Sequence, residues 1–127
     1  MVDRGIKILN VEDSAMMRKV MTGILNKWGF NNLESAENGQ EAMLRIEEGG
    51  IDLVLTDWHM PGSSGLGLIK AVRADPQLAK LPIVMITAEQ DRDMVKHALQ
   101  AGATGFIIKP FNPQKILKAV EAAMARA

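Results

Sequence analysis

Five side chains that could together handle a phosphoryl group stand where short apolar runs of the sequence end. They are Glu12, Asp13, Asp57, Thr87 and Lys109. If the runs are parallel strands, their carboxyl ends meet at one edge of a sheet, where open α/β sheets bind ligands. Three carboxylates at one edge repel each other unless positive charge compensates them. The sequence therefore predicts a charged site that is assembled from distant parts of the chain.

A lysine and a divalent cation are the two sources of compensating charge that such a site can use. The chain has no cysteine and two isolated histidines, so oxygen ligands favour Mg²⁺ or Mn²⁺ over zinc. A hard cation beside a carboxylate, with a hydroxyl and an ammonium opposite, can hold a phosphoryl group. Each residue alone has an ordinary explanation, such as a helix cap for Asp13. Their coincidence at strand ends supports the functional hypothesis.

The elements that must position these residues alternate regularly along the chain. Strands are predicted at 6–11, 33–36, 51–56, 82–86 and 105–108. Helices are predicted around 16–25, 38–48, 66–72, 94–99 and 113–124. Nearly continuous apolar runs are typical of strands buried on both faces, as in a parallel sheet. Five strand-helix repeats predict an α/β fold with a doubly wound parallel sheet, right-handed crossovers and helices on both faces.

Length and composition limit the remaining possibilities. At 127 residues and 47% hydrophobic, the chain is predicted to form one folded domain over 1–127. Fifteen basic and fifteen acidic residues give zero net charge, which argues against nucleic-acid and membrane-surface partners. The absence of cysteine excludes disulfide scaffolds and thiolate sites. We see neither a membrane span nor a signal peptide, and we expect a cytoplasmic protein.

Several of the polar positions lie in short motifs that resemble a known family. The stretches are 11–14 (Val-Glu-Asp-Ser), 29–32, 56–61, 86–89 (Ile-Thr-Ala-Glu) and 109–111 (Lys-Pro-Phe). Together they resemble the receiver domain of two-component response regulators, most of all the stand-alone chemotaxis members. The resemblance covers essentially the whole chain. It implies the flavodoxin-like receiver fold, a five-stranded parallel sheet of strand order 2-1-3-4-5.

The resemblance implies a phospho-acceptor and a metal site. Asp57 would accept a phosphoryl group from a histidine of a sensor kinase or phosphotransfer domain. Asp13 would bind Mg²⁺ directly and Glu12 through water, while Asp57 and the backbone carbonyl of His59 would complete the protein ligands. Phosphoryl transfer asks a protein mainly for positioning and charge stabilisation, and these residue types suit that task.

The resemblance also implies which groups surround the phosphoryl group. Thr87 and the backbone amide of Ala88 would bind its oxygens, and Lys109 would pair with it. His59 lies two residues beyond Asp57, and Glu89 lies two residues beyond Thr87. These two residues would tune hydrolysis of the acyl phosphate. Such a domain would be no enzyme for a separate substrate, but a phospho-acceptor that assists its own phosphorylation and dephosphorylation.

An output surface is expected on the fourth helix, the last strand and the last helix. Phe106 stands where the chemotaxis members carry tyrosine, so a hydroxyl that could bond a target is missing, and binding to the flagellar switch is in question. Movement of the Thr87 hydroxyl toward a phosphoryl group would vacate space for the ring at 106. The expected surface, which suits an acidic and hydrophobic segment of a protein partner, comprises Arg92, Val95, Lys96, Leu99, Phe106, Lys115 and Lys118.

Three alternatives remain beside a stand-alone receiver. The chain could be a receiver cut from a larger response regulator or hybrid kinase. An aspartyl-phosphate phosphatase would need a second aspartate two residues after Asp57, where the sequence has His59. A flavodoxin-like carrier would need a phosphate loop after the first strand, where Glu12 and Asp13 would repel phosphate.

Overall fold

A five-stranded parallel sheet forms the centre of the computed structural model. The structure describes residues 2–60, 63–88 and 92–126, without the side chains of His59, Met60, Ser63 and Arg92. The strands are β1 (Ile8–Val11), β2 (Leu33–Ala36), β3 (Leu53–Asp57), β6 (Ile83–Ala88) and β7 (Gly105–Lys109). They lie in the order β2-β1-β3-β6-β7. Counted within this sheet, the order is 2-1-3-4-5, which confirms the predicted topology.

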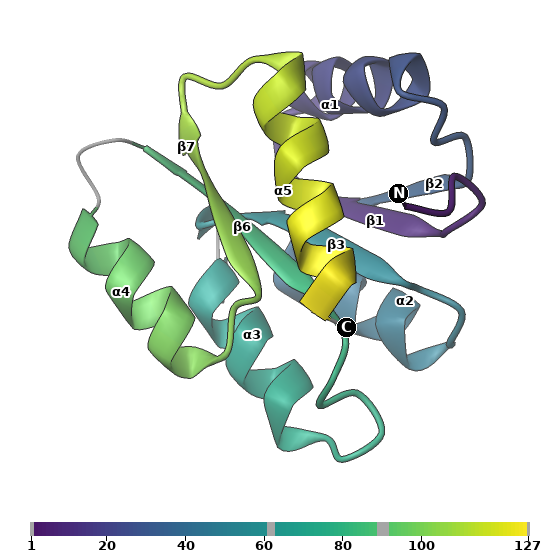
Figure 1. Cartoon of the computed structure of the whole chain (residues 1–127). Coiled ribbons are helices and arrows are strands. Elements are labelled where there is room, and N and C mark those ends of the chain that lie inside the picture. Colours follow the sequence, from purple (N-terminus) through teal and green to yellow (C-terminus); the bar gives the residue numbers. More distant parts are fainter. Residues whose placement is uncertain (1, 61–62, 89–91, 127) are drawn as a thin grey trace.

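Helices cover both faces of the sheet, as Figure 1 shows. The helices α1 (Ala15–Lys27) and α5 (Pro113–Arg126) pack on one face. The other face carries α2 (Gly39–Glu47), α3 (Gly65–Ala74) and α4 (Arg92–Ala101). Each face has its own apolar core, with Ile116 on the α1 and α5 side and Ile69 on the other. None of these helices is both long and apolar enough to span a membrane within the described residues.

Side-chain caps fix where the helices begin at the carboxyl edge of the sheet. Ser14, Asn38 and Ser64 each accept a hydrogen bond from a backbone N–H in the first turn of α1, α2 and α3. Such caps satisfy N–H groups that a helix leaves unpaired at its start. The loops after β1 and β2 therefore lead directly into ordered helices.

The strands extend further toward this edge than the sequence predicted. Asp57 and Thr87 are the last or second-last residues of β3 and β6, because Asp57 pairs with Ile86 and Thr87 with Ile108 in the ladder. The sequence also did not predict a short antiparallel hairpin, β4 (His59–Met60) with β5 (Ser63–Ser64). Asp57 and Thr87 thus belong to the sheet, whereas Glu12 and Asp13 lie in the loop after β1.

Candidate functional site

Three acidic side chains converge at the carboxyl edge of the central strands. Glu12, Asp13 and Asp57 each offer a carboxylate oxygen, and these atoms all lie within 4.8 Å of one another. Glu12 and Asp57 are buried at 8% and 9% exposure, whereas Asp13 is exposed. Neighbouring parallel strands, β1 and β3, bring the residues together across 45 positions of sequence. The predicted acidic cluster is present as a geometric unit.

Lys109 reaches the same cluster from the end of β7. Its Nζ lies 3.1 Å from Asp57 Oδ2, and the two groups form a hydrogen bond that is also an ion pair. Ala88 lies opposite Lys109 in the ladder between β6 and β7. The peptide bond between Lys109 and the next residue, Pro110, is cis. The structure therefore places the expected ammonium beside the expected phospho-acceptor.

Thr87 supplies a hydroxyl that is buried near this edge. The residue is 2% exposed, and Oγ1 has no hydrogen-bond partner in the described part of the chain. Buried polar atoms without a partner are rare in folded proteins and invite an explanation. This hydroxyl is free to donate to a ligand oxygen if the ligand comes within reach.

Crowding of the carboxylates changes the acidity of Glu12. Burial is the largest cause, and hydrogen bonding with Asp13 and the neighbouring charge of Asp57 add to it, raising the pKa of Glu12 from 4.5 to about 7. A hydrogen bond from the Ser14 N–H to Glu12 Oε2, at 3.1 Å, acts in the opposite direction. The cluster holds negative charge at a cost that a bound cation would offset.

The donor set fits the hard cation that the family resemblance implies. All three side chains offer carboxylate oxygens, which Mg²⁺ and Mn²⁺ prefer. The fourth expected ligand, the carbonyl of His59, belongs to β4, two residues beyond Asp57. Burial is the largest cause of the raised pKa of Glu12, and a cation beside its carboxylate would favour the ionised form. Charge and ligand chemistry thus agree with a divalent cation.

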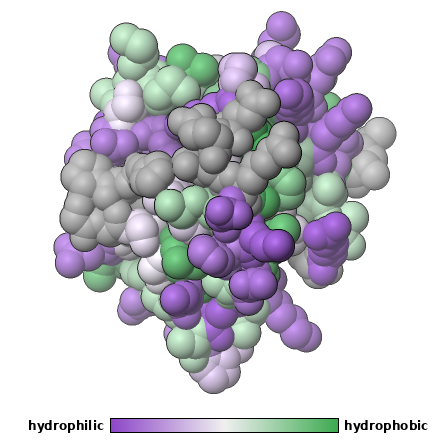
Figure 2. Space-filling view, turned by 90° about the vertical axis from the view of Figure 1, so that its left-hand side faces the viewer, coloured by the Kyte–Doolittle hydropathy of each residue, from purple (hydrophilic) through white to green (hydrophobic). Residues whose placement is uncertain are grey.

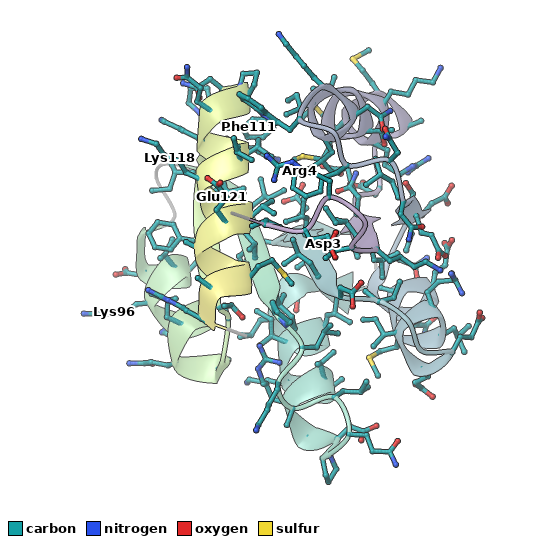
Figure 3. The ribbon with its side chains drawn as sticks, turned by 45° about the vertical axis from the view of Figure 1, so that its right-hand side comes forward. Asp3, Arg4, Lys96, Phe111, Lys118 and Glu121 are labelled. Atoms are coloured by element: carbon teal, nitrogen blue, oxygen red, sulfur yellow. The ribbon has the colours of Figure 1, made fainter. Side chains whose placement is uncertain are left out.

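The expected output residues lie on a different side of the molecule. Phe106 and Leu99 are large hydrophobic residues exposed at 40% and 43%. Lys96 and Lys118 point outward on the same side, from α4 and α5 (Figure 3). The side that carries α4 mixes hydrophilic and hydrophobic residues (Figure 2). A groove of about 390 Å³ between β7 and α5 is lined by Phe106, Ile107, Ile108, Lys115, Lys118 and Ala119.

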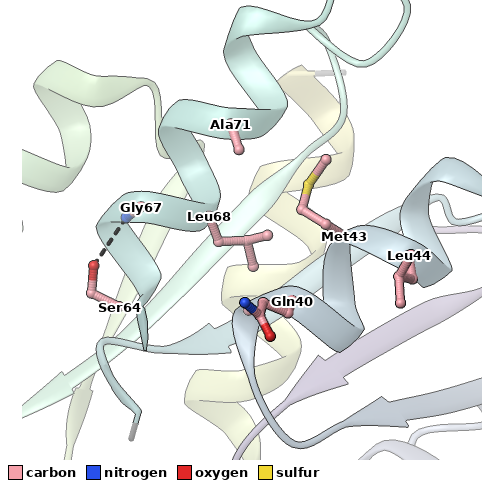
Figure 4. A pocket seen from close by; sticks show the side chains of 8 residues that line it. Gln40, Met43, Leu44, Ser64, Gly67, Leu68 and Ala71 are labelled. Atoms are coloured by element: carbon pink, nitrogen blue, oxygen red, sulfur yellow. Dashed lines mark hydrogen bonds between the residues drawn. The ribbon is translucent and has the colours of Figure 1, made fainter. Parts of the chain in front are cut away.

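Three of the expected residues lie partly or wholly outside the part of the chain that the structure describes. Glu89 is outside the described residues, and only the backbone is described for His59 and Arg92. A larger groove, of about 670 Å³, lies between α2 and α3 and contains none of the residues expected to carry chemistry (Figure 4). Its lining includes Met43, Leu44 and Leu68. The predicted site is therefore an edge cluster rather than a deep pocket.

Two residues near the site were missed by the sequence analysis. Arg18 bonds to the backbone of the loop that carries the acidic pair. Gly65 lies so close to β3 that a Cβ there would be 2.7 Å from the backbone oxygen of Asp57. A glycine directly after a capping serine, and an arginine in the first turn of a helix, were the available signals. Neither is specific without the coordinates.

Comparison with known proteins identifies the family to which the chain belongs. The chain matches the response regulator receiver domain family over residues 8–121. It is 44% identical over 110 residues to the chemotaxis protein CheY-3 of Vibrio cholerae, covering 87% of this chain and 85% of that protein. It is 41% identical over 116 residues to the chemotaxis protein CheY of Pseudomonas aeruginosa, covering 91% of this chain and 94% of that relative.

Solved structures agree with this assignment. Chemotaxis protein CheY4 of Vibrio cholerae superposes with a TM-score of 0.85 at 33% identity, covering 94% of this chain and 98% of that structure. The receiver domain of NtrX from Brucella abortus gives a TM-score of 0.86 at 30% identity, with coverage of 94% and 99%. Sequence and structure thus agree that this chain belongs to the response regulator receiver domains of two-component signalling.

Proposed function

We propose that the chain is a phosphorylatable switch whose phospho-acceptor is Asp57. The observation that carries this proposal is the contact of 3.1 Å between Lys109 Nζ and Asp57 Oδ2, inside a cluster of three carboxylates. Asp57 is the last residue of β3 in the middle of the sheet, so its carboxylate is held in a fixed direction. A rigid nucleophile favours in-line attack, because positioning is the main contribution that a protein makes to phosphoryl transfer.

The donor would be a phosphohistidine of a sensor kinase or a phosphotransfer domain. A carboxylate oxygen of Asp57 forms a bond to phosphorus while the bond between phosphorus and the imidazole nitrogen breaks. The electron pair stays on that nitrogen, and the ring leaves as neutral imidazole because its other nitrogen carries a proton. Lys109 then pairs with a phosphoryl oxygen, and the Thr87 hydroxyl and the Ala88 amide donate to others. Water later hydrolyses the acyl phosphate, at a rate tuned by the side chains of His59 and Glu89.

Residues of this chain would also hold the cation that the reaction needs. Asp13 and Asp57 would bind it directly, Glu12 through water, and the carbonyl of His59 would complete the protein ligands. When bound, Mg²⁺ or Mn²⁺ supplies positive charge that stabilises the phosphoryl oxygens. The chain has no separate substrate in this scheme, so it is a phospho-acceptor that assists its own modification and not an enzyme in the usual sense.

The output would be a protein partner in a chemotaxis pathway. The two relatives that were compared by sequence, CheY-3 and CheY, are chemotaxis proteins, and this chain covers 85% and 94% of their length. The surface of α4, β7 and α5 is basic and apolar, which suits an acidic and hydrophobic segment. Phe106 has no hydroxyl for a target, so a flagellar switch would find only apolar contact at this position of the surface. We propose one receiver domain over 1–127, acting alone or as part of a larger regulator.

The proposal is tested with acetyl phosphate as the donor and intact-mass spectrometry as the readout. We expect one phosphoryl group per chain in the presence of Mg²⁺ and none after chelation. Asp57→Asn should abolish the modification, whereas Asp93→Asn, which changes an exposed aspartate of α4, should leave it unchanged. Full labelling of the Asp57→Asn variant would refute the assignment.

A further inference from the structure

Arg18 folds back from the first turn of α1 over the loop that carries two of the acidic residues. Its Nη1 donates to the backbone oxygen of Glu12 at 2.7 Å and to that of Asp13 at 3.1 Å. Its Nη2 lies 3.5 Å from Glu37 Oε1 in the loop after β2. The two shorter bonds reach the backbone of the acidic pair, while the carboxylates point into the cluster with Asp57.

The loop that Arg18 holds is short. Its other bonds include one from the Ser14 N–H to Glu12 Oε2 at 3.1 Å, but none among the described contacts reaches the carbonyls of Glu12 and Asp13. Only residues 12–14 join the end of β1 to the start of α1. Ser14 caps the helix through the Met17 N–H, and the Glu12 N–H donates to Ala36 O at 2.9 Å. These bonds fix both ends of the loop. The carbonyls of Glu12 and Asp13 are fixed by the arginine, whose side chain is 18% exposed.

We propose that Arg18 is a positioning residue for the cation site. By binding two consecutive carbonyls, it fixes the peptide planes on either side of Asp13 and so the direction in which both acidic side chains leave the backbone. Without the arginine, those carbonyls accept hydrogen bonds from water instead, and the loop samples orientations in which the carboxylates diverge. The inference rests on the proposed function, because it concerns cation binding by the same cluster.

Electrostatics alone predicts the opposite effect, which makes the inference testable by its sign. A guanidinium near the cluster repels a divalent cation, so removing its charge should strengthen cation binding if charge were its only contribution. If Arg18 acts by geometry, its removal should weaken binding. The Arg18→Lys variant is also informative, because lysine keeps the positive charge but lacks the planar guanidinium that can donate to two acceptors.

The experiment compares Arg18→Gln and Arg18→Lys with Lys19→Gln as the matched control. Lys19 is the next residue of α1, is exposed, and has no bond to the loop among the described contacts. Mg²⁺ affinity is measured by tryptophan fluorescence, since Trp58 directly follows Asp57 and is 5% exposed. The titrations are run at a temperature where circular dichroism shows every variant to be folded, so that partial unfolding does not lower the measured Mg²⁺ affinity.

We expect both Arg18 variants to bind Mg²⁺ about tenfold more weakly than the wild type, the lower end of the usual effect of groups that support metal ligands. Lys19→Gln should change the affinity by less than about twofold, because exposed charges are screened by salt. Glu37→Gln should also have little effect, since it leaves both carbonyl bonds in place. Acetyl phosphate labelling of the Arg18 variants should recover as Mg²⁺ is raised.

Two results would overturn the inference. One is an Arg18→Gln variant that binds Mg²⁺ as tightly as the wild type or more tightly, and the other is an Arg18→Lys variant with wild-type affinity. Both outcomes leave the proposed function intact, because the wild type still binds. A wild type that shows no Mg²⁺ response removes the cation site itself, and the inference with it.

Discussion

The raised pKa of Glu12 predicts that the protein without divalent cations loses stability as the pH rises. The folded state holds this proton up to about pH 7, whereas the unfolded chain releases it near 4.5. The folded state therefore binds more protons between these values, and the free energy of unfolding falls as the pH rises through them. At 1.36 kcal/mol per pKa unit, the full change is about 3 kcal/mol. The stability is fully present below pH 4.5 and lost above about 7.

Urea unfolding in a chelating buffer, at pH values from 5 to 8, measures this effect. Glu12→Gln is the informative variant, because it keeps an oxygen that can accept from the Ser14 N–H but has no proton to lose. We expect its stability to be nearly constant over this range and to exceed that of the wild type at pH 8. Parallel curves for the two proteins would refute the reasoning, since the slope would then come from other groups.

Cation binding provides a second measurement of the same linkage. A divalent cation favours the ionised carboxylate, so binding near pH 7 should release about half a proton from Glu12. Calorimetry in two buffers of different ionisation enthalpy measures this release. The stabilisation by Mg²⁺ should also be larger at pH 8 than at pH 5. Equal stabilisation at both pH values would mean that Glu12 does not take part in the site.

Three further changes test the framework around the site. Asn10→Leu should raise the free energy of unfolding by about 1 kcal/mol, because Asn10 is 3% exposed and its Nδ2 has no partner in the described residues; a loss of stability in urea would contradict this. Arg73→Met should lower it by about 2 kcal/mol, since Arg73 donates to Gly102 O at 2.9 Å and to Leu81 O at 2.7 Å. Lys70→Met, one helical turn earlier on the exposed side of α3, should cost far less in the same assay. Phe106→Ala should leave phosphorylation unchanged but remove the amide NMR shifts that we expect phosphorylation to cause on α4 and α5. Shifts identical to the wild type would show that Phe106 does not couple Asp57 to this surface.

The sequence pattern was sufficient for a doubly wound parallel α/β sheet, because the strands are short, apolar and separated by helices of clear periodicity. The strand order of the sheet was implied by the family resemblance and not by the pattern. It was also sufficient for the residues that converge, since parallel strands bring their carboxyl ends to one edge. It could not show that Asp57 and Thr87 lie within the ladder, because a polar residue at the end of an apolar run resembles a boundary. The hairpin of β4 and β5 has only two residues in each strand, which is too short for any periodicity.

The contacts of Arg18 and the pKa of Glu12 lay beyond sequence reasoning for a different reason. Both depend on distances between groups rather than on the order of residue types. A first-turn arginine is common and usually solvated, and only coordinates show that this one reaches two carbonyls. The burial that raises the pKa of Glu12 depends on how closely β1 and β3 bring it to Asp57. Residue types thus predicted which groups meet, but not how strongly they perturb each other.

The groups that this fold leaves unsatisfied are concentrated where a ligand would satisfy them. At the carboxyl edge, three carboxylates lie near one another with Lys109 paired to Asp57, and the Thr87 hydroxyl lacks a partner among the described residues. At the opposite ends of the helices, polar backbone groups do find partners. Arg73 donates hydrogen bonds to the carbonyls of Gly102 and Leu81 there. A cation and a phosphoryl group would relieve repulsion and supply acceptors at one edge only. Under the proposed function, the free energy gained there is absent from the unligated fold, so it would be available to shift β6, β7 and α4 when Asp57 is modified.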